Sequence, residues 1–155
     1  MRKLSFFVII PKIFDLNRII RMIRIKKIVF GLLLLATSLF ADLKQEWATQ
    51  DFLNKNIKII DIRTPTEWRE TGIVNGSYTI MFFDEQGNYD VPKFLKVLDK
   101  VVKKDEQFAL ICRIGSRTGM VSEFLSKDMG YKVINLKGGI MKLISDGYRP
   151  VRYMK

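Results

Sequence analysis

Short apolar runs alternate with amphipathic stretches along residues 42–155, and this alternation constrains the fold more than any other feature. Four runs rich in β-branched, aromatic or other apolar residues are expected to be strands, at 57–61, 78–82, 108–112 and 132–136. The run 108–112 is wholly apolar, so we expect it to be central and buried on both faces. Strands alternating with helices at this spacing predict an α/β domain with a parallel sheet.

The stretches between the predicted strands have helical features. Thr64, Pro65 and Glu67 form a capping-box pattern that predicts the start of a short helix. Apolar residues at a helical period, or a glycine suited to a helix end, support other helices. The predicted ranges for these further helices are 43–54, 91–102, 117–129 and 139–145.

The positive charge is concentrated at the N-terminus. Residues 1–41 have a net charge of +7, whereas residues 42–155 have a net charge of only +4. The total of +11 therefore does not indicate a basic nucleic-acid surface, and we expect no nucleic-acid partner. The modest charge of the second part favours small anionic substrates.

The N-terminal segment is typical of a secretory signal peptide. Basic residues, among them Lys26 and Lys27, precede the apolar run 28–35, and smaller residues then lead to Ala41. We expect a signal-peptide region at 1–41, with translation starting at Met1 or Met22, and one domain at 42–155. This predicts a periplasmic protein. If the segment is not cleaved, it anchors the domain to the inner membrane, facing the periplasm.

The chain has no histidine and a single cysteine, Cys112. A Ser-His-Asp or Cys-His catalytic arrangement and a histidine-ligated metal site are therefore excluded. Nothing in the sequence implies a metal or an organic cofactor. Cys112 is either a buried, inert core residue or a reactive thiol.

The position of Cys112 favours the reactive thiol. It ends a predicted strand, and only the loop 113–116 separates it from Arg117 and the next helix. Successive backbone N–H groups of such a loop can surround a sulfur, and the positive end of the helix adds to their effect. Arg113 and Arg117 add fixed positive charge. All three effects favour the thiolate, which is the nucleophilic form.

Four segments together resemble the rhodanese family. Residues 112–118, Cys-Arg-Ile-Gly-Ser-Arg-Thr, resemble the active-site loop of its single-domain sulfurtransferases. Residues 61–68 resemble the first family motif, residues 72–80 the segment that follows it, and residues 136–151 the C-terminal motif. The matches keep the family order. The resemblance implies a rhodanese-like fold, in which helices flank both faces of a central parallel β-sheet.

The resemblance also implies an activity of the thiosulfate sulfurtransferase type. Cys112 would take sulfur from a small anionic donor, thiosulfate or polysulfide, and pass it as a persulfide to cyanide or a thiol. Asp61 and Arg63 would support the loop as a charge pair. The residues expected to bind the substrate and the persulfide are Arg113, Ile114, Gly115, Ser116, Arg117 and Thr118.

Two alternatives to sulfur transfer remain. Cysteine-dependent phosphatases have five residues between cysteine and arginine, whereas Cys112 and Arg117 enclose four, a smaller loop suited to one sulfur atom. The other alternative is a non-catalytic binding or sensing module with an idle cysteine. The chain also departs from the family at Ile73, Thr79 and Leu143, where His, Asn and Trp are common. These departures indicate a divergent member.

Overall fold

The computed structural model describes residues 43–154. The predicted signal-peptide region, residues 1–41, lies outside this range and stays a prediction. Among the described residues, no helix is both long enough and apolar enough to span a membrane.

A five-stranded parallel sheet forms the centre of the domain, in the order β1-β5-β4-β2-β3. The strands are β1 (Lys44–Trp47), β2 (Lys58–Asp61), β3 (Tyr78–Thr79), β4 (Gln107–Ile111) and β5 (Lys132–Lys137). The predicted α/β class is confirmed. Strand β4 is the central strand, as expected for its apolar sequence.

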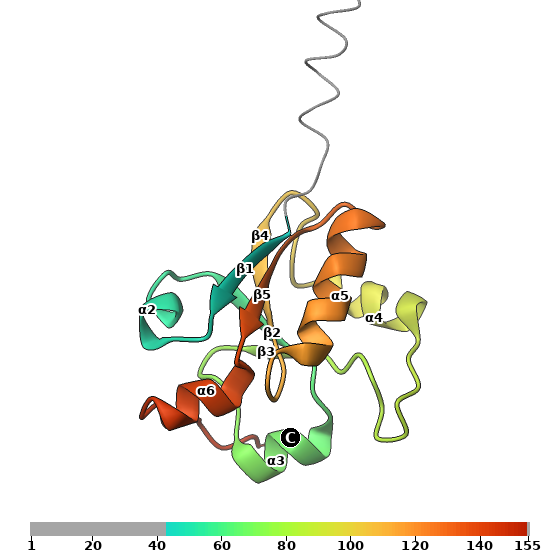
Figure 1. Cartoon of the computed structure of the whole chain (residues 1–155). Helices are drawn as coiled ribbons and strands as arrows, with labels where there is room; N and C mark the ends of the chain where they lie inside the picture. Colours follow the sequence, from blue (N-terminus) through green and yellow to red (C-terminus); the bar gives the residue numbers. More distant parts are fainter. Residues whose placement is uncertain (1–42, 155) are drawn as a thin grey trace, which may run out of the picture. The chain divides into compact units, whose positions relative to one another are not determined.

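Helices cover both faces of this sheet (Figure 1), as the resemblance implied. The helices are α2 (Gln50–Leu53), α3 (Pro65–Thr71), α4 (Val91–Leu98), α5 (Ser116–Lys127) and α6 (Gly139–Ser145). Figure 1 shows α4 and α5 on one side, α2 and α6 on the other, and α3 beyond the carboxyl ends of the strands.

The two faces of β4 belong to two separate apolar clusters. Phe108 and Leu110 pack in the cluster beneath α4 and α5, and Ala109 and Ile111 pack in the cluster beneath α2 and α6. All four residues are fully buried. Because side chains alternate along a strand, a fully apolar strand is what a sheet covered on both faces requires. Strand β4 therefore holds the loop that follows it, at Cys112, on a rigid support.

The predicted helix at 43–54 is wrong. Residues 44–47 form β1, which pairs with β5, and the short helix α2 begins only after Thr49. The Thr49 side chain accepts a hydrogen bond from the Phe52 N–H at 3.2 Å and so caps α2. The β1 side chains are largely exposed, so their sequence has none of the apolar alternation that predicts a strand.

Two other predicted elements are shorter than expected. The strand expected at 78–82 is reduced to β3, because only Tyr78 and Thr79 are in register with β2. The helix expected at 91–102 ends as α4 at Leu98, and Val101 N–H then bonds the carbonyl three residues back, at 2.8 Å. A hydrogen bond of that span closes a turn and does not continue an α-helix.

Candidate active site

Two loops leave the sheet side by side at its carboxyl edge. Asp61 ends β2 and pairs in register with Ile111, which ends β4. The N–H of Ile62 donates to the carbonyl of Ile111 at 3.0 Å, so the strands stay paired as the loops begin. The loop after β2 leads into α3, and the loop after β4 contains Cys112 and leads into α5. In parallel α/β sheets this edge is where ligands bind.

Cys112 lies at the inner end of the second loop and is fully buried. Its Sγ accepts a hydrogen bond from the backbone N–H of Gly115 at 3.1 Å and lies 3.6 Å from the Thr118 Oγ1. The hydroxyl of Thr118 donates to the carbonyl of Gly115 at 3.0 Å. Gly115 has φ +92°, a conformation that glycine adopts without the strain other residues incur. The loop therefore closes around the sulfur with an N–H donor directed at it.

The start of α6 holds this loop from the other side. The N–H groups of Ile140 and Met141 donate to the carbonyls of Cys112 and Arg113, at 2.9 and 3.1 Å. Gly139 has φ +57°, and a Cβ added there would lie 2.4 Å from the Cys112 carbonyl oxygen. Real Cβ atoms do not approach backbone atoms so closely. Glycine at 139 is therefore what lets the α6 segment pack against the cysteine loop.

Arg117, in the first turn of α5, forms a bidentate pair with Glu67 of α3. Its Nη1 and Nη2 donate to the two carboxylate oxygens at 2.8 and 2.6 Å. The pKa of Arg117 is raised, mainly by its hydrogen bonds to Glu67. Burial lowers this pKa, but the negative charge of Glu67 raises it again. Charge and hydrogen bonding of Cys112 raise it further. The Arg117 guanidinium is thus bound to Glu67 and lies within electrostatic reach of Cys112.

Asp61 and Arg63 form the charge pair expected of them, and it is completely buried. Arg63 Nη2 donates to the Asp61 carboxylate at 2.6 Å and to the Gly72 carbonyl at 2.7 Å. Arg63 Nη1 donates to the Thr71 hydroxyl at 2.6 Å. Because this guanidinium is bonded to Thr71 and Gly72 at the C-terminal end of α3, the pair helps to set the position of the helix that carries Glu67.

Of the remaining predicted site residues, three are exposed to solvent and one is buried. Arg113, Ile114 and Ser116 are exposed, and Arg113 lies 3.9 Å from the Glu70 carboxylate. Thr118 is buried beneath the sulfur. The structure brings Cys112, Gly115, Arg117 and Thr118 together and leaves the other three on the rim of the loop.

Two residues at the site were missed as site residues. In the sequence, Glu67 has only the signal of a helix cap, and Gly139 is only the first residue of a predicted helix. The capping box is present, since Thr64 N–H donates to the Glu67 carboxylate at 3.1 Å and Glu67 N–H to the Thr64 Oγ1 at 3.3 Å. Local pattern gives no signal for the contact between Glu67 and Arg117, which are 50 positions apart.

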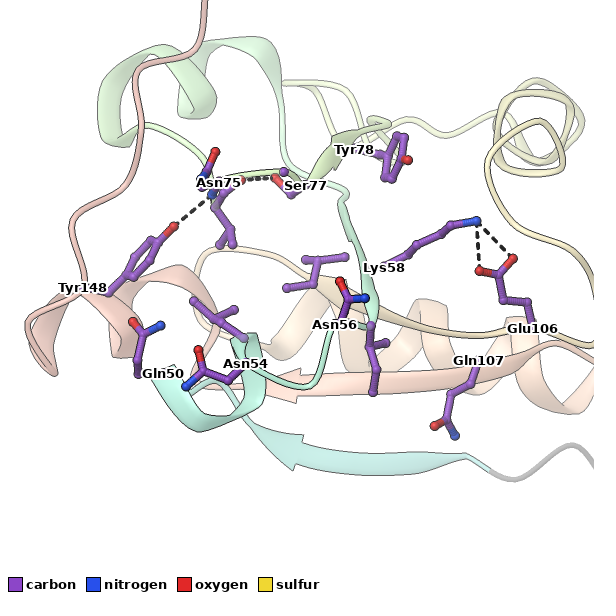
Figure 2. A pocket seen from close by; sticks show the side chains of 15 residues that line it. Gln50, Asn54, Asn56, Lys58, Asn75, Ser77, Tyr78, Glu106, Gln107 and Tyr148 are labelled. Carbon is purple, nitrogen blue, oxygen red and sulfur yellow. Dashed lines mark hydrogen bonds and ion pairs between the residues drawn. The ribbon is translucent and has the colours of Figure 1, made fainter.

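A separate hollow of about 650 Å³ lies near the amino ends of β2 and β4 (Figure 2). Lys58, which begins β2, pairs there with Glu106, and the Tyr148 hydroxyl accepts a hydrogen bond from the backbone N–H of Asn75. The residues lining it include neither Cys112 nor an arginine. It is therefore at the opposite end of the strands from the thiol.

Comparisons with known proteins agree with this arrangement. A family profile described as the rhodanese-like domain matches residues 44–146. "Putative sulfurtransferase YtwF" of Bacillus subtilis is 30% identical over 88 residues, which are 57% of this chain and 74% of that protein. "Protein HIGH ARSENIC CONTENT 1, mitochondrial" of Arabidopsis thaliana is 25% identical over 103 residues, 66% of this chain and 61% of that protein.

A solved structure shows the same fold. The crystal structure of a rhodanese-like domain protein from Staphylococcus aureus has a TM-score of 0.53 and 21% identity, and the match covers 73% of this chain and all of that one. The profile match covers more than half of the chain and includes both loops of the site. The chain belongs to the rhodanese-like domain family.

Proposed function

We propose that this protein is a sulfurtransferase or sulfur carrier that uses Cys112 as its nucleophile. One observation carries the proposal: the Cys112 Sγ sits in a closed loop at the carboxyl edge of the sheet, with the Gly115 N–H 3.1 Å away. Arg117, whose pKa is raised first by Glu67 and further by Cys112, supplies positive charge beside it. Both can stabilise the negative charge that the sulfur carries in a persulfide.

The proposed reaction has two displacement steps. The thiolate of Cys112 attacks the outer sulfur of thiosulfate, a new S–S bond forms, and the old S–S bond breaks as sulfite leaves with its electron pair. The cysteine persulfide carries one negative charge. Cyanide or a thiolate then attacks the terminal sulfur, and the Cys112 thiolate leaves. With a polysulfide donor the first step is the same, with a shorter polysulfide as the leaving group.

The loop supports the persulfide as well as the thiolate. Backbone N–H groups directed into a loop stabilise an anion wherever it forms inside. The two arginines of the loop, Arg113 and Arg117, supply positive charge for an anionic donor. We also propose that the reaction takes place in the periplasm, on the strength of the signal-peptide pattern at residues 1–41.

Turnover tests the proposal. The chain is incubated with thiosulfate and cyanide, and thiocyanate release is measured for wild type and Cys112→Ser. We expect release by wild type and background release by the variant. Equal release by both would contradict the proposal. An aryl phosphate serves as a second substrate, and we expect no phosphate release, since the four-residue spacing between Cys112 and Arg117 is too small for a phosphoryl group.

A second candidate is a non-catalytic binding module, and one observation favours it: Cys112 is fully buried. An idle core cysteine would have the same burial. The two candidates differ in thiol accessibility, because sulfur transfer requires the loop to admit a donor. Alkylation of folded wild-type protein by iodoacetamide supports the sulfurtransferase, and a thiol that reacts only after unfolding supports the binding module.

A further inference from the structure

The contact between Glu67 and Arg117 joins the two loops of the site. Both carboxylate oxygens of Glu67 are used, and each accepts from a different guanidinium nitrogen, at 2.6 and 2.8 Å. Such a bidentate pair fixes the plane of the guanidinium as well as its distance. The two side chains are 16% and 25% exposed, so solvent screens the pair only in part.

Glu67 is itself held in place. One of its carboxylate oxygens also accepts the Thr64 N–H at 3.1 Å, and its backbone carbonyl lies 3.4 Å from the Arg63 Nη1. Arg63 is fully buried and bonded to Asp61. The residue that binds Arg117 is thus tied both to the Thr64 cap and to the buried pair of Asp61 and Arg63.

The pairing leaves Arg117 poorly suited to bind a donor. Two of its nitrogens are occupied by Glu67. Arg117 also lines a hollow of about 280 Å³ whose other lining residues include Asp84 and Glu85, and these two carboxylates repel an anion. Arg113, by contrast, has an exposed side chain and only a long 3.9 Å contact with Glu70. The two arginines of the loop therefore have different surroundings.

We propose that Glu67 is a positioning residue that holds Arg117 against Cys112, and that Arg113 is the arginine that meets the donor's negative charge. The proposal rests on the sulfurtransferase function, because it assigns roles within that reaction. It predicts that Glu67 acts on the reactivity of the thiol, whereas Arg113 acts on binding of the donor.

The test compares Glu67→Ala with Thr64→Ala in the full chain. Thr64→Ala removes the other half of the capping box and leaves the Arg117 pair, so it controls for weakening of α3. The rate of iodoacetamide alkylation of Cys112 is measured against pH. We expect the midpoint of this curve to lie at higher pH in Glu67→Ala, because the nearby positive charge is no longer held in place. At neutral pH we therefore expect slower alkylation than in wild type. Thr64→Ala should leave the midpoint unchanged.

Glu67→Gln provides a milder variant that keeps an oxygen for Arg117 and a side chain for the cap. We expect a smaller rise in the midpoint than in Glu67→Ala. An unchanged midpoint in both variants, or a lower one, would overturn the positioning role, since a lower midpoint would mean that Glu67 only neutralises Arg117. Because alkylation needs no sulfur donor, this outcome is distinct from failure of the proposed function, in which the folded wild type is not alkylated at all.

Steady-state kinetics test the second half of the proposal. With thiosulfate as the varied substrate, Arg113→Ala should raise KM and leave kcat nearly unchanged, whereas Glu67→Ala should lower kcat and leave KM nearly unchanged. The reverse pattern, with Glu67→Ala raising KM, would assign the donor to Arg117 and overturn the division between the arginines.

Discussion

The loops after β2 and β4 begin side by side but use their polar groups in opposite ways. In the first loop, Asp61 and Arg63 are fully buried, and their groups are bonded to each other and to the C-terminal end of α3. In the second, Cys112 has one N–H donor within 3.1 Å, while Arg113 and Ile114 face solvent. The polar groups of the first loop are buried and support the fold. The second loop has exposed side chains around a buried sulfur. The difference predicts that substitutions in the first loop affect folding, whereas those on the rim of the second affect chemistry.

Arg63→Met gives the largest expected effect. It leaves the Asp61 carboxylate buried without its partner, so we expect a loss of about 3–5 kcal/mol in the free energy of unfolding. Urea denaturation measures it. The double variant Asp61→Leu with Arg63→Met removes both charges and should recover part of the loss. A loss below about 1 kcal/mol for the single variant would contradict the view of this loop as a support.

Gly139→Ala tests the packing that holds the second loop. The new Cβ would collide with the Cys112 carbonyl oxygen, 2.4 Å away. Gly76→Ala is the matched control, since Gly76 also has positive φ but no atom within 4 Å of an added Cβ. We expect Gly139→Ala to cost about 2 kcal/mol more than Gly76→Ala in unfolding free energy. Equal losses in unfolding free energy for the two variants would show that the start of α6 separates easily from the Cys112 loop.

Arg113→Ala tests the rim of the second loop. Because the side chain is exposed and only loosely paired, we expect the free energy of unfolding to change by less than about 0.5 kcal/mol. The KM for thiosulfate should rise on the order of tenfold, the value of one charge-assisted hydrogen bond. A stable variant with unchanged KM would mean that the donor binds elsewhere.

Glu67 connects the two loops, and the smallest expected effect is the change in stability with pH between wild type and Glu67→Gln. Burial alone would raise the pKa of its carboxyl, but hydrogen bonds from Arg117 and the Thr64 N–H outweigh burial and lower it below 4.5. A lowered pKa in the folded state means that Glu67 stabilises the fold above about pH 4.5, and that this contribution is lost as the pH falls through the folded pKa. Wild type should therefore exceed Glu67→Gln in stability at pH 7, and the difference should shrink at pH 3. A difference that grows in acid would contradict this sign.

The sequence predicts those elements whose residues are themselves buried or locally capped. The apolar run at 108–112 predicts strand β4, and the Thr64–Glu67 capping box predicts α3. Strand β1 was missed because Lys44, Gln45 and Trp47 are exposed and the strand exists only through its pairing with β5. Its pairing is a tertiary interaction, and strand propensity depends strongly on such context.

The same limit applies to the site. The position of Cys112 between a strand and a helix was visible in the sequence, because strand, loop and helix are contiguous. The partner of Arg117 and the contact of Gly139 were not visible, because they depend on how separate βα loops meet at the edge of the sheet. Local sequence patterns predict where each loop lies along the chain. Which side chains of different loops touch depends on the packing of the whole domain.

The intact mass of the protein after exposure to a sulfur donor tests the central claim most directly. The chain is incubated with thiosulfate or polysulfide and its mass is taken under non-reducing conditions, with Cys112→Ser alongside. We expect a gain of one sulfur atom that is absent in the variant and reversed by cyanide with release of thiocyanate. No gain with either donor, or an equal gain in Cys112→Ser, would contradict it.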